Sequence, residues 1–319
     1  MLPLLTLTLL AASVASQTAA AQTTAAQTAA TPCAGQIVRD ATGDVCVPKA
    51  PKRIVTIDWA YSEDLLALGL QPVGMADIKG FVQYVKTPVP VAASVKELGQ
   101  RDAVSLEALA ALKPDLIIDA QGVNKREQFS KIAPTLMFNP YPKSGITAYQ
   151  DMRRTFALIG KVTGRSEQAR AVLAALDADA ARARQTLAAS GRSGQTFVLS
   201  QGYTYNTPTM RLFGPRSMGS QILEQIGLRN AYRSNVPEYG FDTLSLEGLT
   251  TLKTQNFFGI TASDDNIFTA SGNQALWNAL PFVRQGRGYA LSPDTWLFGG
   301  PSSARTLMAQ VVTVMTARR

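Results

Sequence analysis

The chain has 319 residues, 46% of them apolar, and a formal net charge of +8, with 31 Lys and Arg residues against 23 Asp and Glu. This length exceeds the usual size of one hydrophobic core, so we expect two domains. The absence of histidine excludes Ser-His-Asp and Cys-His catalysis and removes the commonest protein ligand of zinc, copper and haem. The basic residues are scattered rather than interleaved with aromatic residues, which argues against nucleic acid as a partner.

The N-terminal segment has the features of an export signal. Leu2 through Val14 are apolar, and Ala19-Ala20-Ala21 supplies the small residues of a cleavage site, which predicts a signal peptide over 1–21. No Lys or Arg precedes Arg39, so the usual positive segment is missing. Residues 22–35 are expected to form a disordered leader, since their composition cannot bury a core. We therefore expect a periplasmic or otherwise extracytoplasmic protein.

Cys33 and Cys46 are the only two cysteines. In an exported protein such a pair is more often a disulfide than a metal or catalytic site. The bond would pin a hairpin formed by residues 37–40 and 45–47, around the turn Thr42-Gly43-Asp44.

Residues 36–164 are predicted to form a first α/β lobe. Its apolar strand candidates alternate with helical segments, a pattern that predicts a mostly parallel sheet flanked by helices. The segments in chain order are a strand at 53–57, a helix at 62–68, a strand at 72–75, a helix from 105, and strands at 115–119 and 135–138.

A single long helix is predicted between the lobes. Residues 167–189 contain no Gly or Pro and carry apolar residues at helical spacing, so we assign an interlobe helix to 165–190. Thr196–Ser200 then opens a second α/β lobe over 191–319. Lobes joined by one rigid helix should hinge little.

An internal repeat supports the two-lobe architecture. The string Ser105–Lys113 recurs as Ser245–Lys253, with every Ser, Leu, Glu and Lys displaced by 140 positions, and Asp64–Leu70 resembles Ile222–Leu228. Each copy begins with a Ser that can cap a helix. Two similar lobes predict a functional cleft between them.

Sequence motifs of common enzymes are absent. The chain has no G-x-S-x-G, Walker A or G-x-G-x-x-G string. Its 23 acidic residues always offer carboxylate pairs, so an exported α/β enzyme that uses carboxylates stays open as an alternative. We nevertheless expect no catalysis.

Three parts of the chain carry a family resemblance: Pro51–Gly74 with Leu112–Ile117, Leu212–Tyr232, and Leu276–Gly300. They resemble the periplasmic substrate-binding proteins of ABC importers that capture ferric siderophores, cobalamin and haem, and most of all the ferric-hydroxamate branch. The resemblance implies two lobes joined by one long helix, no cofactor, and an Fe(III)-siderophore complex as ligand. A haem or cobalamin ligand in the same fold is the nearest alternative, with haem iron then met by Tyr.

The resemblance also implies ligand contacts. Arg101, in Leu98–Asp102, matches an Arg that contacts the iron-hydroxamate centre with forked donors. Tyr239 matches an aromatic residue of the second lobe, Phe298 replaces a family Tyr, and Val123 stands near a further family Tyr. Other candidates for the cleft surface are Trp59, Tyr61, Tyr84, Tyr203, Tyr205, Arg211, Arg216 and Trp296.

Two acidic residues are expected to dock onto the transporter. In the family one surface Glu on each lobe enters an Arg pocket of the permease, and Glu107 and Glu247 occupy these places in the repeat. Such charges orient encounter more than they add affinity. Each Glu can also favour its own helix N-terminus, by about 0.3 to 1 kcal/mol. The expected partners are a ferric siderophore and an ABC permease with its ATPase, and the binding protein is expected to be a monomer.

Overall fold

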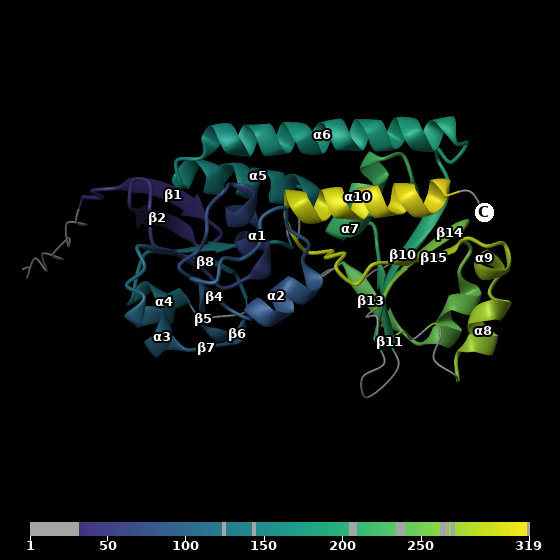
Figure 1. The fold of residues 1–319 in the computed structure, drawn as a ribbon, viewed down its shortest axis with the longest axis horizontal. Coiled ribbons are helices and arrows are strands. Elements are labelled where there is room, and N and C mark those ends of the chain that lie inside the picture. Colours follow the sequence, from purple (N-terminus) through teal and green to yellow (C-terminus); the bar gives the residue numbers. More distant parts are fainter. Residues whose placement is uncertain are drawn as a thin grey trace, which may run out of the picture. The chain divides into compact units, whose positions relative to one another are not determined.

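The computed structural model describes residues 32–122, 126–141, 145–203, 209–233, 240–261, 266, 268 and 272–317. The predicted signal peptide over 1–21 lies outside these residues. Residues 33–319 form one unit that contains two β-sheets, each with helices on both faces (Figure 1). We call the lobe around the first sheet the N-lobe and the lobe around the second sheet the C-lobe. The α/β class with two lobes is as predicted.

The N-lobe sheet is entirely parallel, with the strand order β5-β4-β3-β8-β9. Its strands are β3 (Ile54–Thr56), β4 (Gly74–Met75), β5 (Lys96–Glu97), β8 (Leu116–Ala120) and β9 (Thr135–Phe138). The helices are α1 (Trp59–Ala67), α2 (Ile78–Tyr84), α3 (Leu106–Ala111), α4 (Arg126–Ser130) and α5 (Ala148–Val162). Alternate strand residues point to opposite faces, so Ile54 packs among α1 and α5 while Val55 packs among α3 and α4.

Two hairpins complete the N-lobe. One pairs β1 (Gln36–Asp40) with β2 (Gly43–Val47), and the other pairs β6 (Gly99–Gln100) with β7 (Ala103–Val104). The first is closed by the predicted Cys33–Cys46 disulfide, which is confirmed with an S–S distance of 2.04 Å. The Oδ2 atom of Asp40 accepts a hydrogen bond from the Met137 amide at 2.8 Å, and this attaches the hairpin to β9.

The C-lobe sheet is mixed, with the order β13-β11-β10-β14-β15 and β12 beside β10. Its strands are β10 (Thr196–Tyr203), β11 (Thr209–Phe213), β12 (Arg229–Asn230), β13 (Phe241–Leu244), β14 (Asn256–Ile260) and β15 (Gly288–Leu291). The pairs β10-β14, β14-β15 and β10-β12 are parallel, and β11 pairs antiparallel with β10 and β13. The helices are α7 (Met218–Gln225), the 3-10 helix η1 (Leu246–Thr251), α8 (Gln274–Ala279), α9 (Pro281–Arg284) and α10 (Pro301–Thr316).

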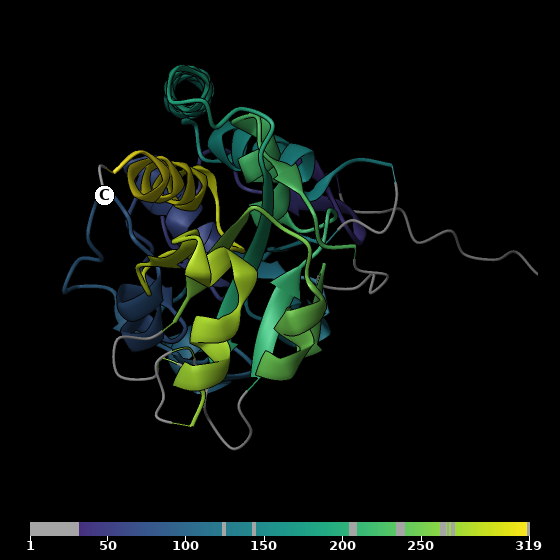
Figure 2. The same ribbon diagram turned by 90° about the vertical axis from the view of Figure 1, so that its right-hand side faces the viewer.

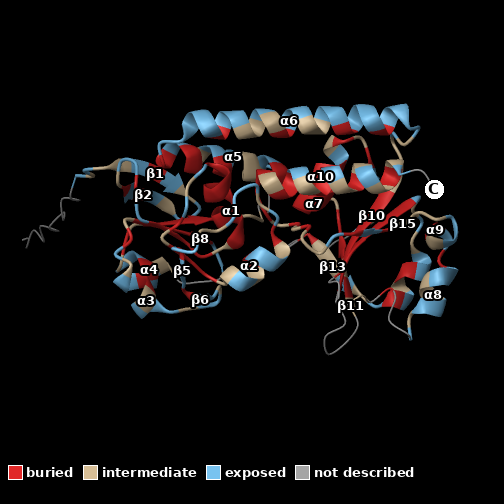
Figure 3. Cartoon of the chain, in the orientation of Figure 1, coloured by how far each residue is buried: buried red, intermediate tan, exposed pale blue. Residues whose placement is uncertain are grey.

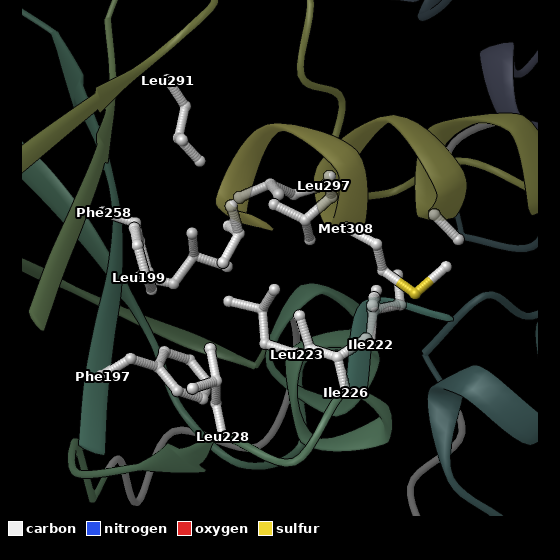
Figure 4. Close-up of a cluster of buried hydrophobic side chains, with 14 of the residues drawn as sticks. Phe197, Leu199, Ile222, Leu223, Ile226, Leu228, Phe258, Leu291, Leu297 and Met308 are labelled. Carbon is white, nitrogen blue, oxygen red and sulfur yellow. The ribbon is translucent and has the colours of Figure 1, made fainter. Parts of the chain in front are cut away.

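The main C-lobe core lies between the sheet and the helices α7 and α10. Figure 4 shows Phe197 and Phe258 of the sheet facing Ile222 and Leu223 of α7, with Met308 of α10 on the same cluster. Buried strand residues form the centre of both lobes, and α1 is buried along its whole length, whereas α6 (Ser166–Ala189) exposes its outer face (Figure 3).

The predicted long helix is α6 (Ser166–Ala189), which runs beside α5 and α10 and lies outermost when viewed along its axis (Figures 1 and 2). At 1.5 Å per residue it is about 36 Å long. Ala169 belongs to the N-lobe core, while Leu176 and Leu187 belong to the C-lobe core. One helix thus contributes to both interiors. Within the described ranges, no helix combines the length and apolar character that a membrane crossing requires.

The two copies of the repeat adopt different helices. In α3 the Ser105 hydroxyl accepts a hydrogen bond from the Ala108 amide at 3.2 Å, whereas Ser245 makes no such cap and η1 is a 3-10 helix. The second copy has Gly248 where the first has Ala108, and β-branched Thr replaces Ala at two further positions. These residues have lower helix propensity, which accounts for the difference.

A buried carboxylate joins the lobes directly. Glu63 of α1 accepts hydrogen bonds from the amide and the hydroxyl of Ser303, at 2.7 and 2.5 Å, in the first turn of α10. The N-cap residue of α10 is Gly300, which has no side chain to cap the helix. A Cβ atom on Gly299 would collide with Glu63. An acidic residue of the N-lobe therefore caps a helix whose body lies in the C-lobe.

Asp64, the neighbour of Glu63, is buried, and within the described residues one of its carboxylate oxygens lacks a hydrogen bond. Its Oδ1 atom has no hydrogen-bond partner among the described residues, and a Cβ atom on Gly300 would collide with it. Burial raises the pKa of the Asp64 carboxyl well above its usual range, and the charges of Glu63 and Asp58 raise it further. The protonated form is therefore favoured at this position.

Removing the cap between the lobes should destabilise the protein. Glu63→Ala leaves the amide and hydroxyl of Ser303 without an acceptor, so we expect the free energy of unfolding in urea to fall by about 2 to 3 kcal/mol. The control is Glu167→Ala, because the Glu167 side chain is 85% exposed and its pairing with Arg170 is worth at most about 1 kcal/mol. Equal losses in the two variants would show that Glu63 does not join the lobes.

Asp64→Asn should change how stability depends on pH. The folded chain holds the Asp64 proton more tightly than the unfolded chain does, so wild-type stability falls as the pH rises above about 4, the ordinary pKa of aspartate. Asn removes this loss. We expect the Tm of the variant to match the wild type near pH 4 and to exceed it increasingly towards pH 8. Exposed Asp102→Asn should follow the wild type, and a constant offset for Asp64→Asn would contradict the argument.

Candidate functional site

A cleft of about 220 Å³ lies between the lobes, with four lining residues from each. Strand ends position much of it: Asp58 follows β3, and Pro140 and Tyr141 follow β9, at the carboxyl edge where α/β proteins commonly bind ligands. The full lining is Asp58, Arg101, Pro140 and Tyr141 from the N-lobe and Arg211, Phe241, Trp296 and Phe298 from the C-lobe.

Arg101 stands at the turn of the β6-β7 hairpin and lies flat on an aromatic side chain. Its guanidinium carbon is 4.0 Å from the ring centre of Trp59 and 6.0 Å from that of Trp296. Its Nη1 atom is 3.8 Å from Oδ2 of Asp58. Cation–π stacking and the ion pair therefore orient Arg101 before any ligand arrives.

Aromatic rings continue from this point across the cleft. The ring centres of Trp59 and Trp296 are 5.0 Å apart, those of Trp296 and Phe298 are 5.2 Å apart, and those of Phe298 and Tyr141 are 6.2 Å apart. All three pairs meet edge to face, a favourable arrangement for aromatic quadrupoles. The side chains from the two lobes thus form one continuous apolar wall.

Arg211 supplies a second positive charge on the C-lobe side. Its guanidinium carbon lies 4.7 Å from the ring centre of Phe241. The two residues sit on the paired strands β11 and β13, in the diagonal relation that brings long side chains into contact.

Asp58 is the acidic residue of the cleft lining. Its Oδ1 atom accepts a hydrogen bond from the Ala60 amide at 2.9 Å and caps α1. Burial raises the pKa of the Asp58 carboxyl, although the Ala60 amide and Arg101 act in the opposite direction. This carboxylate was not among the sequence candidates.

A second, smaller cavity of about 40 Å³ adjoins the cleft and shares Pro140, Tyr141 and Phe298 with its lining. It has room for a few water molecules. Tyr61, Asp64 and Arg216 line it. Arg216, predicted as a ligand contact, lines this adjoining cavity as an exposed residue, and its role as a ligand contact stays a prediction.

The structure brings some of the predicted residues together and leaves others apart. Arg101, Arg211, Trp296 and Phe298 line the cleft, and Trp59, only 4% exposed, supports Arg101 from behind. Tyr84 stacks on Trp59 with ring centres 6.3 Å apart and does not line the cleft. Tyr203 ends β10, and its side chain is not described; Val123, Tyr205 and Tyr239 lie outside the described residues. The roles of Tyr203, Tyr205 and Tyr239 as ligand contacts stay predictions, whereas Val123 only stands near the place of a family Tyr.

Sequence reasoning missed Asp58, Tyr141 and Phe241 as lining residues. Asp58 and Tyr141 each follow a buried strand, and that position was a usable signal. Phe241 comes two residues after the candidate Tyr239 and directly after Gly240. Within the described ranges, no group of three or more Asp, Glu or Cys side chains is placed to hold a metal ion.

Comparison with known proteins gives a consistent result. The family model described as "Periplasmic binding protein" matches residues 54–295. The chain is 28% identical over 261 residues to the iron(3+)-hydroxamate-binding protein FhuD of Escherichia coli, covering 80% of this chain and 83% of the relative. It is 26% identical over 280 residues to the Fe(3+)-citrate-binding protein YfmC of Bacillus subtilis, covering 87% and 85%.

A solved structure supports the same assignment. The siderophore-binding protein FhuD of Vibrio cholerae, crystallised with Fe3+-Desferal, superposes with a TM-score of 0.75 at 27% identity, covering 83% of this chain and 98% of that one. The family model includes β3 and Arg101 of the N-lobe and runs through the C-lobe as far as Thr295. The chain therefore belongs to the periplasmic binding protein family.

Proposed function

We propose that this protein is an extracytoplasmic solute-binding protein that captures a ferric siderophore in the cleft and delivers it, chemically unchanged, to an ABC permease with its ATPase. The observation that carries the proposal is Arg101, stacked on Trp59 at the cleft between the lobes. The relatives named for iron(3+)-hydroxamate and Fe(3+)-citrate support it. Export by the predicted signal peptide and action as a monomer belong to the same proposal.

The cleft offers the contacts that an iron-siderophore centre needs. The oxygen atoms around the iron carry partial negative charge, and a guanidinium presents rigid, forked N–H donors to such oxygens. The carbon atoms between these oxygens can pack on the aromatic side chains of Trp296, Phe298 and Tyr141. Iron is the cargo, and its coordination sphere is filled by the siderophore, so no protein ligand to the metal is required.

The size of the cleft favours recognition of the iron centre alone. Its volume of about 220 Å³ is below the roughly 300 to 1,000 Å³ of enclosing small-molecule pockets. A siderophore would therefore insert its iron centre between the lobes and leave part of its backbone outside. Binding then selects the metal-chelate chemistry more than the backbone structure.

Titration of Trp fluorescence tests the proposal, because two of the three Trp residues, Trp59 and Trp296, border the cleft. We expect saturable quenching by a ferric hydroxamate. Arg101→Ala should weaken binding by about ten- to a hundredfold, the range for a hydrogen bond to a charged group.

The matched control is Arg39→Ala, since the Arg39 side chain is 80% exposed on the β1-β2 hairpin. It should leave the affinity unchanged. Ferric catecholate, ferric citrate, haem and cobalamin are titrated in parallel. Saturation by haem or cobalamin alone would identify that compound as the ligand in place of a ferric siderophore. The absence of saturation by any of these compounds would overturn the transport proposal.

Docking to the permease is proposed to use Glu107 and Glu247, both exposed in the first turn of their helices. The helix α3 packs on the N-lobe face that holds α4, and η1 packs on the C-lobe face that holds α8 and α9. Both are the sheet faces opposite those covered by α6. A hydrogen bond with Ser245 lowers the pKa of the Glu247 carboxyl.

Charge reversal separates docking from ligand capture. The double variant Glu107→Arg with Glu247→Arg should retain siderophore affinity but reduce uptake of radiolabelled ferric siderophore at least about tenfold in cells that carry it as their sole copy. Glu167→Arg is the control, because Glu167 is also exposed in the first turn of its helix, and that helix, α6, lies on the sheet faces opposite the proposed docking surface. Normal uptake by the double variant would exclude these two residues as docking contacts.

A further inference from the structure

Asp58 combines a structural role with a position in the ligand cleft. One carboxylate oxygen caps α1 through the Ala60 amide, and the other is 3.8 Å from the Arg101 guanidinium. The side chain keeps 19% of its surface exposed and lines the cleft. Its charge can therefore act on a bound ligand as well as on Arg101.

Capping does not explain the charge. Asn or Ser caps a helix about as well as Asp does, since the cap needs only an oxygen acceptor. Burial raises the pKa of the Asp58 carboxyl, so the site works against its ionisation. The charged group that the structure places beside this carboxylate is Arg101, at the cleft, so its second contact is with the ligand-binding surface.

The charges that line the described cleft are one negative, Asp58, and two positive, Arg101 and Arg211. Asp58 offsets much of the field of Arg101 at short range, because the two groups are in contact. A ligand in the cleft thus meets the hydrogen-bond donors of Arg101, while Asp58 reduces the positive charge around them.

Ferric siderophores differ in the charge of their iron centre. Three hydroxamates cancel the charge of Fe(III), so a ferric trihydroxamate centre is neutral. Three catecholates leave three negative charges on the centre. A fixed carboxylate at the cleft repels the second kind and has little effect on the first.

We propose that Asp58 is a specificity-determining residue that restricts this cleft to ferric complexes of low charge, neutral trihydroxamates over anionic tricatecholates. The inference rests on the proposed function and narrows its ligand class. Asp58 acts by charge repulsion of the wrong ligand and by positioning Arg101 on Trp59 for the right one.

The test is the ratio of two dissociation constants, for ferric enterobactin as the tricatecholate and ferrichrome as the neutral trihydroxamate. The wild type should bind ferrichrome more tightly. Asp58→Asn keeps the cap and removes the charge, so the ratio should fall at least about tenfold, mainly through tighter binding of the anion. The change should shrink at high salt, since it is electrostatic.

Asp77→Asn is the matched control. Asp77 caps α2 through the Gly80 amide at 3.1 Å and does not line the cleft, so its substitution should leave the ratio unchanged. Asp58→Ser provides a second uncharged cap if the Asn variant folds poorly.

Each outcome separates the inference from the proposed function. An unchanged ratio in folded Asp58→Asn and Asp58→Ser, or wild-type preference for ferric enterobactin, would overturn the specificity role and leave siderophore capture standing. If Asp58→Asn weakens the binding of both ligands equally and lowers the Tm, Asp58 acts only as a structural cap. If the wild type binds neither ligand, the specificity role of Asp58 is overturned, and the titrations with ferric citrate, haem and cobalamin decide whether the proposed function stands.

Discussion

The arrangement of the cleft depends on the carboxylate of Glu63 at the first turn of α10. Glu63 belongs to α1, whose beginning carries Trp59, and the chain reaches α10 directly after Trp296 and Phe298. This hydrogen-bonded group, together with the buried Tyr149 amide that donates to Gln221 at 2.8 Å, helps to set how far apart the N-lobe and C-lobe walls stand. Glycines at positions 299 and 300 make this approach possible, because any side chain there would collide with Glu63 or Asp64.

This constraint has a consequence for how ligand is captured. The lobes share α6, whose residues enter both cores, and they share the Glu63 cap, so little opening is available without breaking buried contacts. Arg101 and its aromatic neighbours already touch across the cleft. A preorganised site has a small ordering cost on binding, but it cannot close over its ligand. Selectivity must then come from the chemistry of the cleft surface, and charge becomes one of its main determinants.

Whether a feature of this structure could be predicted from the sequence depends on how far apart along the chain its interacting residues lie. Local patterns predicted α6, the disulfide hairpin and the alternating elements of the N-lobe correctly, since they depend on neighbours in sequence. The repeat predicted two lobes but not that its second copy would form a 3-10 helix, where Gly248 lowers helix propensity. The roles of Glu63 and Asp58 were not predicted, because their partners Ser303 and Arg101 lie far along the chain. Arg216 lines the cavity that adjoins the cleft, and its role as a ligand contact stays a prediction, because sequence cannot show which of two adjoining cavities a side chain borders.

Asp58, Glu63 and Asp64 lie close together along the chain at the start of the first α/β unit, but each has different surroundings. These surroundings determine how easily each carboxyl can be ionised. Glu63 accepts hydrogen bonds from Ser303 at a helix N-terminus, and these lower the pKa of its carboxyl, although burial raises that pKa by more. The Oδ1 atom of Asp64 has no hydrogen-bond partner in the described structure, and burial raises the pKa of this carboxyl well above its usual range. Asp58 lies between these cases: one amide and the edge of Arg101 partly offset its burial. Of the three it is the one that borders the cleft, so its charge is felt by whatever binds there, whereas the other two act on the protein alone.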